Sequence, residues 1–378
     1  MTTFIDFHAL HTLAPSNVNR GEDGAPKTAT FGGVRRQRIS SQALKAAQRR
    51  GFAQYFDSSE LGVRTKRVVE LVARRMLQLD DSLEESEALA RSEAAFKKAK
   101  IKLVKPKAKK GEEAKAATAD YLMFLGRHQV DRLAQALVDA GEQGLKSRAD
   151  AQNLLDTEHA IDVALFGRMV ANNATLNVDA AVQVAHALGV HAAAPDFDFY
   201  TAVDDLQRQD EETGAGMIGT VEMMSSTFYR YATINVDQLI QNLGSVEAAV
   251  RSVQAFATTF VETLPTGKQN TFASHTLPEV VAVAVRDRRP VSYVNAFERA
   301  IEASEGEDRR FLAAQSMAAE AVSVSDTYGL SPKVALVMAI PSLREAVDPL
   351  GRGVSRDEFA AELQRVVEES AAGLQVEA

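Results

Sequence analysis

The strand-forming segments of this chain lie near its two ends, and this placement limits the folds that it can adopt. Phe4–Leu13 is rich in apolar and aromatic residues and reads as a first strand, while the apolar runs around Val280–Val285 and Val334–Ile340 read as buried strands. From Ser58 to Gly189, Arg, Ala, Glu and Leu dominate, and runs such as RTKRVVELVARRML and LEESEALARSEAAF predict helices. We therefore predict an α+β protein whose sheet is assembled from segments far apart in the chain.

The segment that follows the helical block predicts a long hairpin or an extended loop. PDFDFYTAVDD is strand-like, the centre is acidic and then rich in glycine, and TFYRYATIN is strand-like again. Gly214, Gly216 and Gly219 spell the G-x-G-x-x-G pattern of dinucleotide sites, but the residues before them form a poor strand. We interpret these glycines as a hairpin tip. Further on, we predict a helix over Phe297–Ala321 and a closing helix in SRDEFAAELQRVVEESAAG, capped by Ser or Asp.

The charge of the stretch Ser16–Arg50 is opposite to that of the whole chain. The protein has a net charge of −8, whereas this stretch holds eight basic and two acidic residues. It therefore carries +6, and everything else sums to −14. A local reversal of sign of this kind indicates a built site for an anion.

The second half of this stretch predicts a helix that begins at a Ser40 or Ser41 cap and ends or kinks near Gly51. At about 100° per residue, Gln42, Lys45 and Arg49 share one stripe, whereas Leu44, Ala47, Gly51 and Tyr55 lie on the opposite side. An amide, an ammonium and a guanidinium group in a row suit a phosphate backbone. The alternative is a helix whose basic face is only solvated.

The loop before this helix strengthens the prediction of an anion site. SNVNRGEDGAPK is rich in Asn, Gly and Ser, and FGGVRRQR sets paired glycines beside three arginines. Glycines allow a ligand to approach the backbone closely, and exposed N–H groups add to a positive field. The alternative is a tight turn with solvated arginines. Farther along, Lys268, Gln269 and Asn270 in PTGKQNTF form a donor-rich turn that lacks the pattern of a nucleotide-triphosphate loop.

Composition excludes several other classes of protein. The chain has no cysteine, which excludes disulfides and cysteine-based zinc sites. The apolar runs are too short to span a bilayer, and MTTFIDFHAL does not read as a secretory signal, so we expect a soluble, cytoplasmic protein. Strand alternation puts Asp6 and His8 on one face and His11 on the other, which argues against a shared metal.

Residues 97–115 carry nine lysines and two glutamates with little that could pack, and predict a solvated loop. Such a lysine arm can attract a nucleic-acid backbone without reading its sequence.

The basic stretch resembles the N-terminal motif of the CasC family, the repeated backbone subunit of the type I-E CRISPR Cascade surveillance complex. The resemblance begins with PSNVNRGEDGAPKTATFGGVRRQRISSQALK. It continues in the family's order through ALFGRM, NVDAAVQVAHA, YTAVDDLQRQDEETGAGMIGT, TFYRYATIN, GKQNTFASHTLP and VNAFE. The motifs cover most of the chain except the lysine-rich helical block.

This resemblance implies a hand-shaped subunit. An RRM-like (ferredoxin-like) palm is expected in residues 1–57 and 190–378, with a β-hairpin thumb at 196–228 inserted in it and helical fingers at 58–189. It also implies several copies stacked head to tail along a guide RNA, contacts with other Cascade subunits and target DNA, and a separately recruited helicase-nuclease. No cofactor and no metal are implied.

The family's motifs imply a set of RNA-binding residues in this chain. Met169 is expected to be an apolar wedge near the bases, and Met217 and Ile218 are expected to wedge bases from the thumb tip. The expected RNA-binding residues are Asn19, Lys27, Ser40, Gln42, Lys45, Arg49, Arg168, Met169, Met217, Ile218, Lys268 and Gln269. A looser expectation, without a motif behind it, is that Lys105, Lys107, Lys109 and Lys110 guide target DNA.

Two other functions remain open from the residues. One is an endoribonuclease that uses His8, His11 or His275 as general acid and base. The other is an RNA-binding module that acts as a monomer, without stacking along the RNA.

Overall fold

The computed structural model describes residues 2–106, 115–171, 173–202 and 217–376. Within them the chain divides into two compact units. Unit 1 comprises residues 1–51, 184–233 and 256–366, and unit 2 comprises residues 52–183, 234–255 and 367–378. Both strands and helices are present in the described residues, so the predicted α+β class is confirmed.

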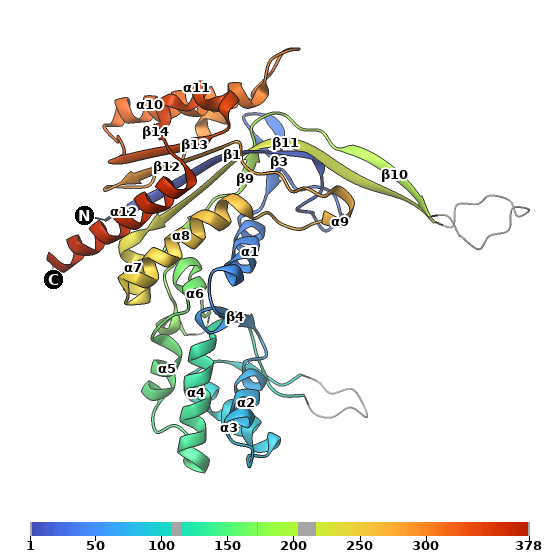
Figure 1. The fold of residues 1–378 in the computed structure, drawn as a ribbon. Coiled ribbons are helices and arrows are strands. Elements are labelled where there is room, and N and C mark those ends of the chain that lie inside the picture. Colours follow the sequence, from blue (N-terminus) through green and yellow to red (C-terminus); the bar gives the residue numbers. More distant parts are fainter. Residues whose placement is uncertain (1, 107–114, 172, 203–216, 377–378) are drawn as a thin grey trace, which may run out of the picture. The chain divides into compact units, whose positions relative to one another are not determined.

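A mostly antiparallel sheet forms the centre of unit 1 (Figure 1). Its strands run in the order β14-β13-β12-β1-β11-β9-β3-β2, and β10 pairs with β11. The sheet therefore combines strands from the two ends of the chain, as the placement of the apolar runs predicted, with strands from residues 187–235. The bounds are β1 (Phe4–Ser16), β2 (Thr28–Phe31), β3 (Val34–Ile39), β9 (Ala187–Gly189), β10 (Asp196–Ala202), β11 (Met217–Asn235), β12 (Val280–Arg286), β13 (Val334–Ala339) and β14 (Arg352–Gly353).

Both faces of β1 are buried. Phe7 packs against Phe256 and Phe260 in the C-terminal half of α8 (Val246–Glu262). Leu10, on the other face, joins a core with α10 (Arg309–Tyr328) and α11 (Arg344–Val347). Because β12 pairs along β1 from Leu10 to Phe4, the strand lies in the interior of the sheet, where each face needs an apolar cover.

Two predictions differ from the structure. The helix expected over Phe297–Ala321 begins only at Arg309, where the Asp308 side chain accepts a hydrogen bond from the Arg310 N–H. Before it, Gly306 has a φ of +88°, which is incompatible with a continuous helix. Tyr55 was expected on the buried side of the basic helix, but that helix ends at Gly51 and Tyr55 is 38% exposed.

Helices surround a separate core in unit 2, built from residues of α2 (Val68–Leu79), α3 (Glu85–Lys98), α4 (Arg127–Ala140) and α5 (Arg148–Asp156). The predicted helices are thus confirmed, but four short strands among them were not predicted. They are β4 (Gly62–Thr65), β5 (Leu103–Val104), β6 (Thr118–Ala119) and β7 (Met123–Gly126).

The remaining elements complete the two units. They are α1 (Ser41–Gly51), α6 (Ile161–Phe166), α7 (Val236–Leu243), α9 (Gln269–Phe272), α12 (Arg356–Val376) and β8 (Val182–Val184). Ser355 and Glu358 exchange hydrogen bonds at the start of α12, so the predicted serine cap is confirmed. None of the described helices is long and apolar enough to cross a membrane.

Candidate nucleic-acid interface

The start of α1 is the centre of a basic site in unit 1. The Ser40 hydroxyl oxygen accepts a hydrogen bond from the Ala43 N–H at 3.3 Å, so Ser40 is the N-cap, one of the two residues predicted. Leu44 and Ala47 are buried, as predicted, whereas Gln42 is exposed and Lys45 and Arg49 are partly exposed. The predicted stripe of Gln42, Lys45 and Arg49 therefore lies toward solvent.

The loop before the helix is fixed to it by hydrogen bonds. The Asn19 side-chain oxygen accepts from the Ser40 N–H at 2.8 Å, and the Lys27 carbonyl accepts from the Arg38 N–H at 2.8 Å. Ser40 is buried, and the side-chain oxygen of Asn19 already accepts a hydrogen bond from the Ser40 N–H. In this structure the Asn19 side chain joins the loop to the start of the helix and the Ser40 side chain caps the helix, and these roles differ from the RNA contact that the motif implied for both.

Lys27, Arg38 and Lys45 come from three segments, and the positive charge of each acts on one histidine, His186. Burial lowers the pKa of His186, and the positive charges of Arg38, Lys27 and Lys45 lower it further. Its Nδ1 atom lies 3.0 Å from the Ser41 N atom and 3.3 Å from Arg38 Nη1. The sequence analysis did not single out His186, although it belongs to the NVDAAVQVAHA motif.

Arg36 does not belong to this site, although it adds to the charge of the basic stretch. It is fully buried, and its guanidinium donates to the carbonyls of Phe31, Gly189, Phe297 and Glu298. The alternative of a tight turn is correct for the paired glycines. Gly32 and Gly33 have φ values of +59° and +76° and form the turn between β2 and β3. The close approach there is to the Glu298 carbonyl of the chain itself.

The donor-rich turn at Lys268 packs against the same N-terminal loop. The Gly267 N–H donates to the Val18 carbonyl at 3.2 Å, and a Cβ atom on Gly267 would lie only 2.4 Å from that oxygen. Lys268 adopts a left-handed conformation, with a φ of +50°, before α9. This contact joins two segments that are about 250 residues apart in the sequence. Lys268 and Gln269 therefore lie beside the loop that continues into Asn19.

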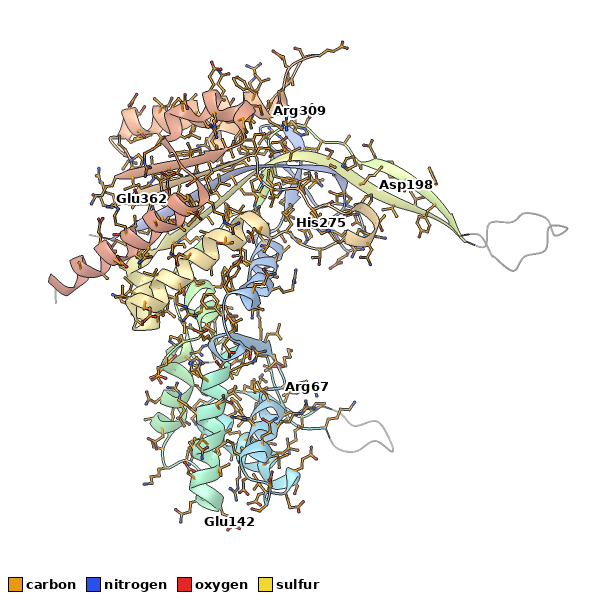
Figure 2. All side chains as sticks on the ribbon, viewed as in Figure 1. Arg67, Glu142, Asp198, His275, Arg309 and Glu362 are labelled. Atoms are coloured by element: carbon orange, nitrogen blue, oxygen red, sulfur yellow. The ribbon has the colours of Figure 1, made fainter. Side chains whose placement is uncertain are left out.

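The three histidines of the alternative endoribonuclease hypothesis differ in accessibility. His8 and His11 are buried, and burial lowers the pKa of each to about 3, so both are neutral at physiological pH. His8 Nδ1 contacts the Tyr229 hydroxyl, and His11 Nε2 contacts Thr276. His275 is exposed beside α9, where Figure 2 labels it. Among the described residues, no cluster of three His, Cys, Asp or Glu side chains could hold a metal ion.

The paired strands β10 and β11 confirm the predicted hairpin; Asp198 marks it in Figure 2. Met217 and Ile218 pair through the backbone with Ala202 and Thr201, at the end of the described part of β11. Gly214, Gly216, Lys107, Lys109 and Lys110 lie outside the described residues. Lys105 is described, and its ammonium lies 3.9 Å from a Glu93 carboxylate oxygen.

The hairpin also presents aromatic residues that the sequence analysis did not assign to a site. Phe197 and Phe199 are 57% and 75% exposed, and the DFDFY alternation could have revealed them. Tyr200 lies opposite Gly219, where a Cβ atom would be 2.4 Å from the tyrosine ring. Gly219 thus makes room for the Tyr200 ring. This contact explains the glycine at this position without a dinucleotide-binding site.

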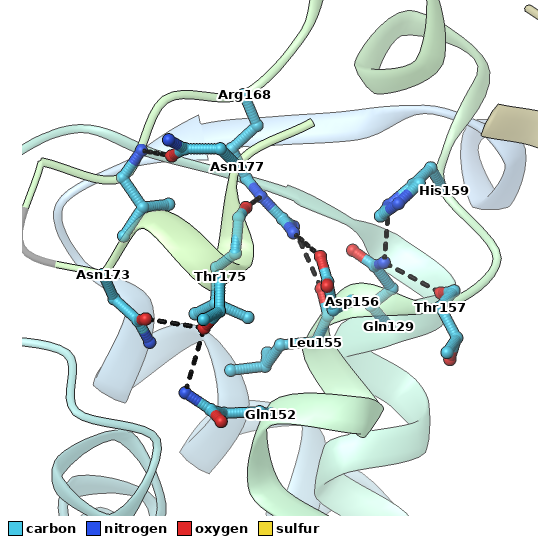
Figure 3. A network of polar contacts seen from close by, with 12 residues as sticks. Gln129, Gln152, Leu155, Asp156, Thr157, His159, Arg168, Asn173, Thr175 and Asn177 are labelled. Atoms are coloured by element: carbon cyan, nitrogen blue, oxygen red, sulfur yellow. Dashed lines mark hydrogen bonds and ion pairs between the residues drawn. The ribbon is translucent and has the colours of Figure 1, made fainter. Parts of the chain in front are cut away.

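Arg168 of unit 2 is an interior residue (Figure 3). Its guanidinium donates to the Leu176 carbonyl at 2.7 Å, the Leu155 carbonyl at 2.9 Å and the Asp156 carboxylate at 2.6 Å. The side chain is only 1% exposed, so in this structure Arg168 supports the interior of unit 2, and the RNA contact that the motif implied for it stays a prediction. Three acceptors thus hold the guanidinium in the interior.

Met169, next to Arg168, is instead 79% exposed. The residues on both sides of it are fixed, because Arg168 pairs with Val178 through the backbone and the Val170 N–H donates to the Asn177 side chain at 2.6 Å. An exposed methionine between two anchored neighbours fits the wedge that the motif implied.

Comparisons with known proteins agree with the resemblance found in the sequence. A chain of a structure described as "CRISPR RNA-guided surveillance complex, pre-nicking" superimposes with a TM-score of 0.83 at 32% identity, covering 95% of this chain and 100% of that one. A chain of a second "CRISPR RNA-guided surveillance complex" gives a TM-score of 0.73 at 28% identity, covering 95% and 99%. No curated protein sequence matches significantly. The sequence pattern of the CT1975-like protein family matches residues 5–364. The chain therefore belongs to the CT1975-like protein family, which confirms the resemblance to CasC.

Proposed function

We propose that this chain is a non-catalytic subunit that binds a CRISPR guide RNA and forms the backbone of a type I-E Cascade surveillance complex. Copies stack head to tail along the guide and present it for pairing with target DNA. The observation that carries this proposal is the likeness over 95% of the chain, with a TM-score of 0.83, to a chain of a complex described as CRISPR RNA-guided.

The basic site of unit 1 supplies the means of holding RNA. The positive charges of Lys27, Arg38 and Lys45 all act on His186, and Lys268 lies beside the loop that carries Asn19. Cations and N–H donors of this kind contact phosphates without reading sequence. The protein thus holds the backbone and leaves the bases free, so base pairing supplies the specificity, as in other guided systems.

The hand-shaped organisation belongs to the same proposal. The RRM-like palm is residues 1–57 and 190–378, the fingers are 58–189, and the thumb is the hairpin at 196–228. Met217, Ile218 and Met169 are the proposed apolar wedges between bases. Target DNA, other Cascade subunits and a recruited helicase-nuclease are the proposed partners, in the cytoplasm.

The first experiment measures how RNA affinity depends on salt. Lys45→Ala combined with Arg49→Ala should weaken binding of any single-stranded RNA and reduce the slope of log K against log salt by about 1.4 to 1.8, because two phosphate contacts are lost. Lys333→Ala combined with Arg352→Ala is the control, since these two cations of unit 1 pair with Asp287 and Glu362. An unchanged slope in the first variant would remove the basic site from the proposal.

A further inference from the structure

His186 is held in place on both sides. The Ala185 N–H donates to the Tyr231 carbonyl at 3.0 Å, and Ala187 pairs with Ile39 in the sheet. The imidazole itself is exposed. The backbone hydrogen bonds therefore fix the position of the His186 Cα atom, and the exposed imidazole can reach a ligand from that position.

Two hydrogen bonds define the protonation state of the His186 ring. Nδ1 lies 3.0 Å from the Ser41 N–H nitrogen and 3.3 Å from Arg38 Nη1. A backbone N–H and a guanidinium can only donate, so Nδ1 must accept and carries no proton. The imidazole is therefore neutral, and its proton is on Nε2.

The neutral ring completes the donor set of the basic site. Nε2 lies on the side of the ring away from Nδ1, so the N–H points away from the start of α1. Arg38 lies 3.3 Å from Nδ1, and the positive charges of Arg38, Lys27 and Lys45 all act on the ring and attract an anion to the same place. A neutral donor among them can make one short hydrogen bond to a phosphate oxygen without repelling its neighbours.

We propose that His186 is a further RNA-contact residue, which donates its Nε2–H to a backbone phosphate held by Lys27, Arg38 and Lys45. This proposal rests on the proposed function. It differs from the contacts of the lysines in one measurable respect, because a neutral donor releases no counterion from RNA.

The experiment compares His186→Ala, His186→Asn and Lys45→Ala, using one single-stranded guide RNA at several salt concentrations. Asparagine keeps a side-chain oxygen near the position of Nδ1 and can still accept from Ser41, but it has no group at Nε2. Both histidine variants should weaken binding by about tenfold at every salt concentration, with the slope unchanged. Lys45→Ala should reduce the slope by about 0.7 to 0.9.

Three results would overturn the proposal. Unchanged affinity in both histidine variants would show that no phosphate is bound there. Weaker binding by His186→Ala but not by His186→Asn would show that His186 only holds the start of α1. A lower slope in the histidine variants would show that the ring is charged when RNA binds. If Lys45→Ala is also without effect, the failure lies in the proposed function itself.

Discussion

Replacing Arg168 by methionine tests whether this residue is an interior support or an RNA contact. Methionine has a similar length but no donor, so the Asp156 carboxylate and the Leu155 and Leu176 carbonyls would each lose a hydrogen bond. Removing one partner of a buried ion pair costs about 3–5 kcal/mol. The Asp156 side chain is 32% exposed and regains some hydration, so we expect the low end, about 3 kcal/mol.

The assay for Arg168→Met is hydrogen exchange of the backbone amides in residues 148–178, because the two units need not unfold together. Opening of this segment should become easier by about 3 kcal/mol, or roughly 150-fold in the exchange rate of the best-protected amides. Arg74→Met is a matched control in the same unit. Arg74 pairs with Glu70 but is 70% exposed, so it should cost at most about 1 kcal/mol.

The opposite outcome would refute the reasoning about Arg168. If Arg168→Met leaves exchange unchanged while it lowers the salt slope of RNA binding by about 0.7 to 0.9, the guanidinium contacts a phosphate. The burial of Arg168 in this structure would then not describe the RNA-bound protein.

Three further predictions follow from the same structure. His8 and His11 have a pKa of about 3 in the folded protein, so below about pH 6.5 only the unfolded chain binds protons at these two residues. The free energy of unfolding in urea should therefore fall by about 1.3 kcal/mol for each histidine between pH 7 and pH 5.5. A free energy of unfolding that does not change over this range would contradict their neutral burial. Gly32→Ala places a Cβ atom 1.6 Å from the Glu298 carbonyl oxygen, whereas a Cβ atom on Gly33 would meet nothing within 4 Å. Gly33→Ala should therefore cost only about 1–2 kcal/mol for its left-handed backbone, and Gly32→Ala should destabilise the protein by more. Equal melting temperatures of the two variants would contradict this. Guide RNA incubated with the protein should stay intact on a denaturing gel, and cleavage that His275→Ala abolishes would identify a nuclease.

Local patterns in the sequence predicted several elements, because apolar runs must be buried and a serine before a helix can cap it. The strand β1, the Ser40 cap of α1 and the buried strand β12 are confirmed. Each depends on residues within a few positions of one another, and the periodicity of side chains is a local property.

The parts that the sequence did not predict depend on which distant segments meet. Arg36 and Arg38 look alike in FGGVRRQR, but carbonyls from residues 189, 297 and 298 surround only Arg36. Likewise, His186 reaches the first N–H of α1 across 145 positions. Arg168 is similar, since the GRM motif gives no sign that Asp156 and two carbonyls enclose it. Burial of an arginine is a property of the assembled fold.

The most direct test of the account measures the mass of the protein bound to guide RNAs of increasing length. If the chain is a backbone subunit, the mass measured by light scattering should rise in regular steps, each step adding one copy as the guide lengthens. Head-to-tail packing continues along a polymer until something ends it. A complex that keeps one copy on every guide length would contradict the account.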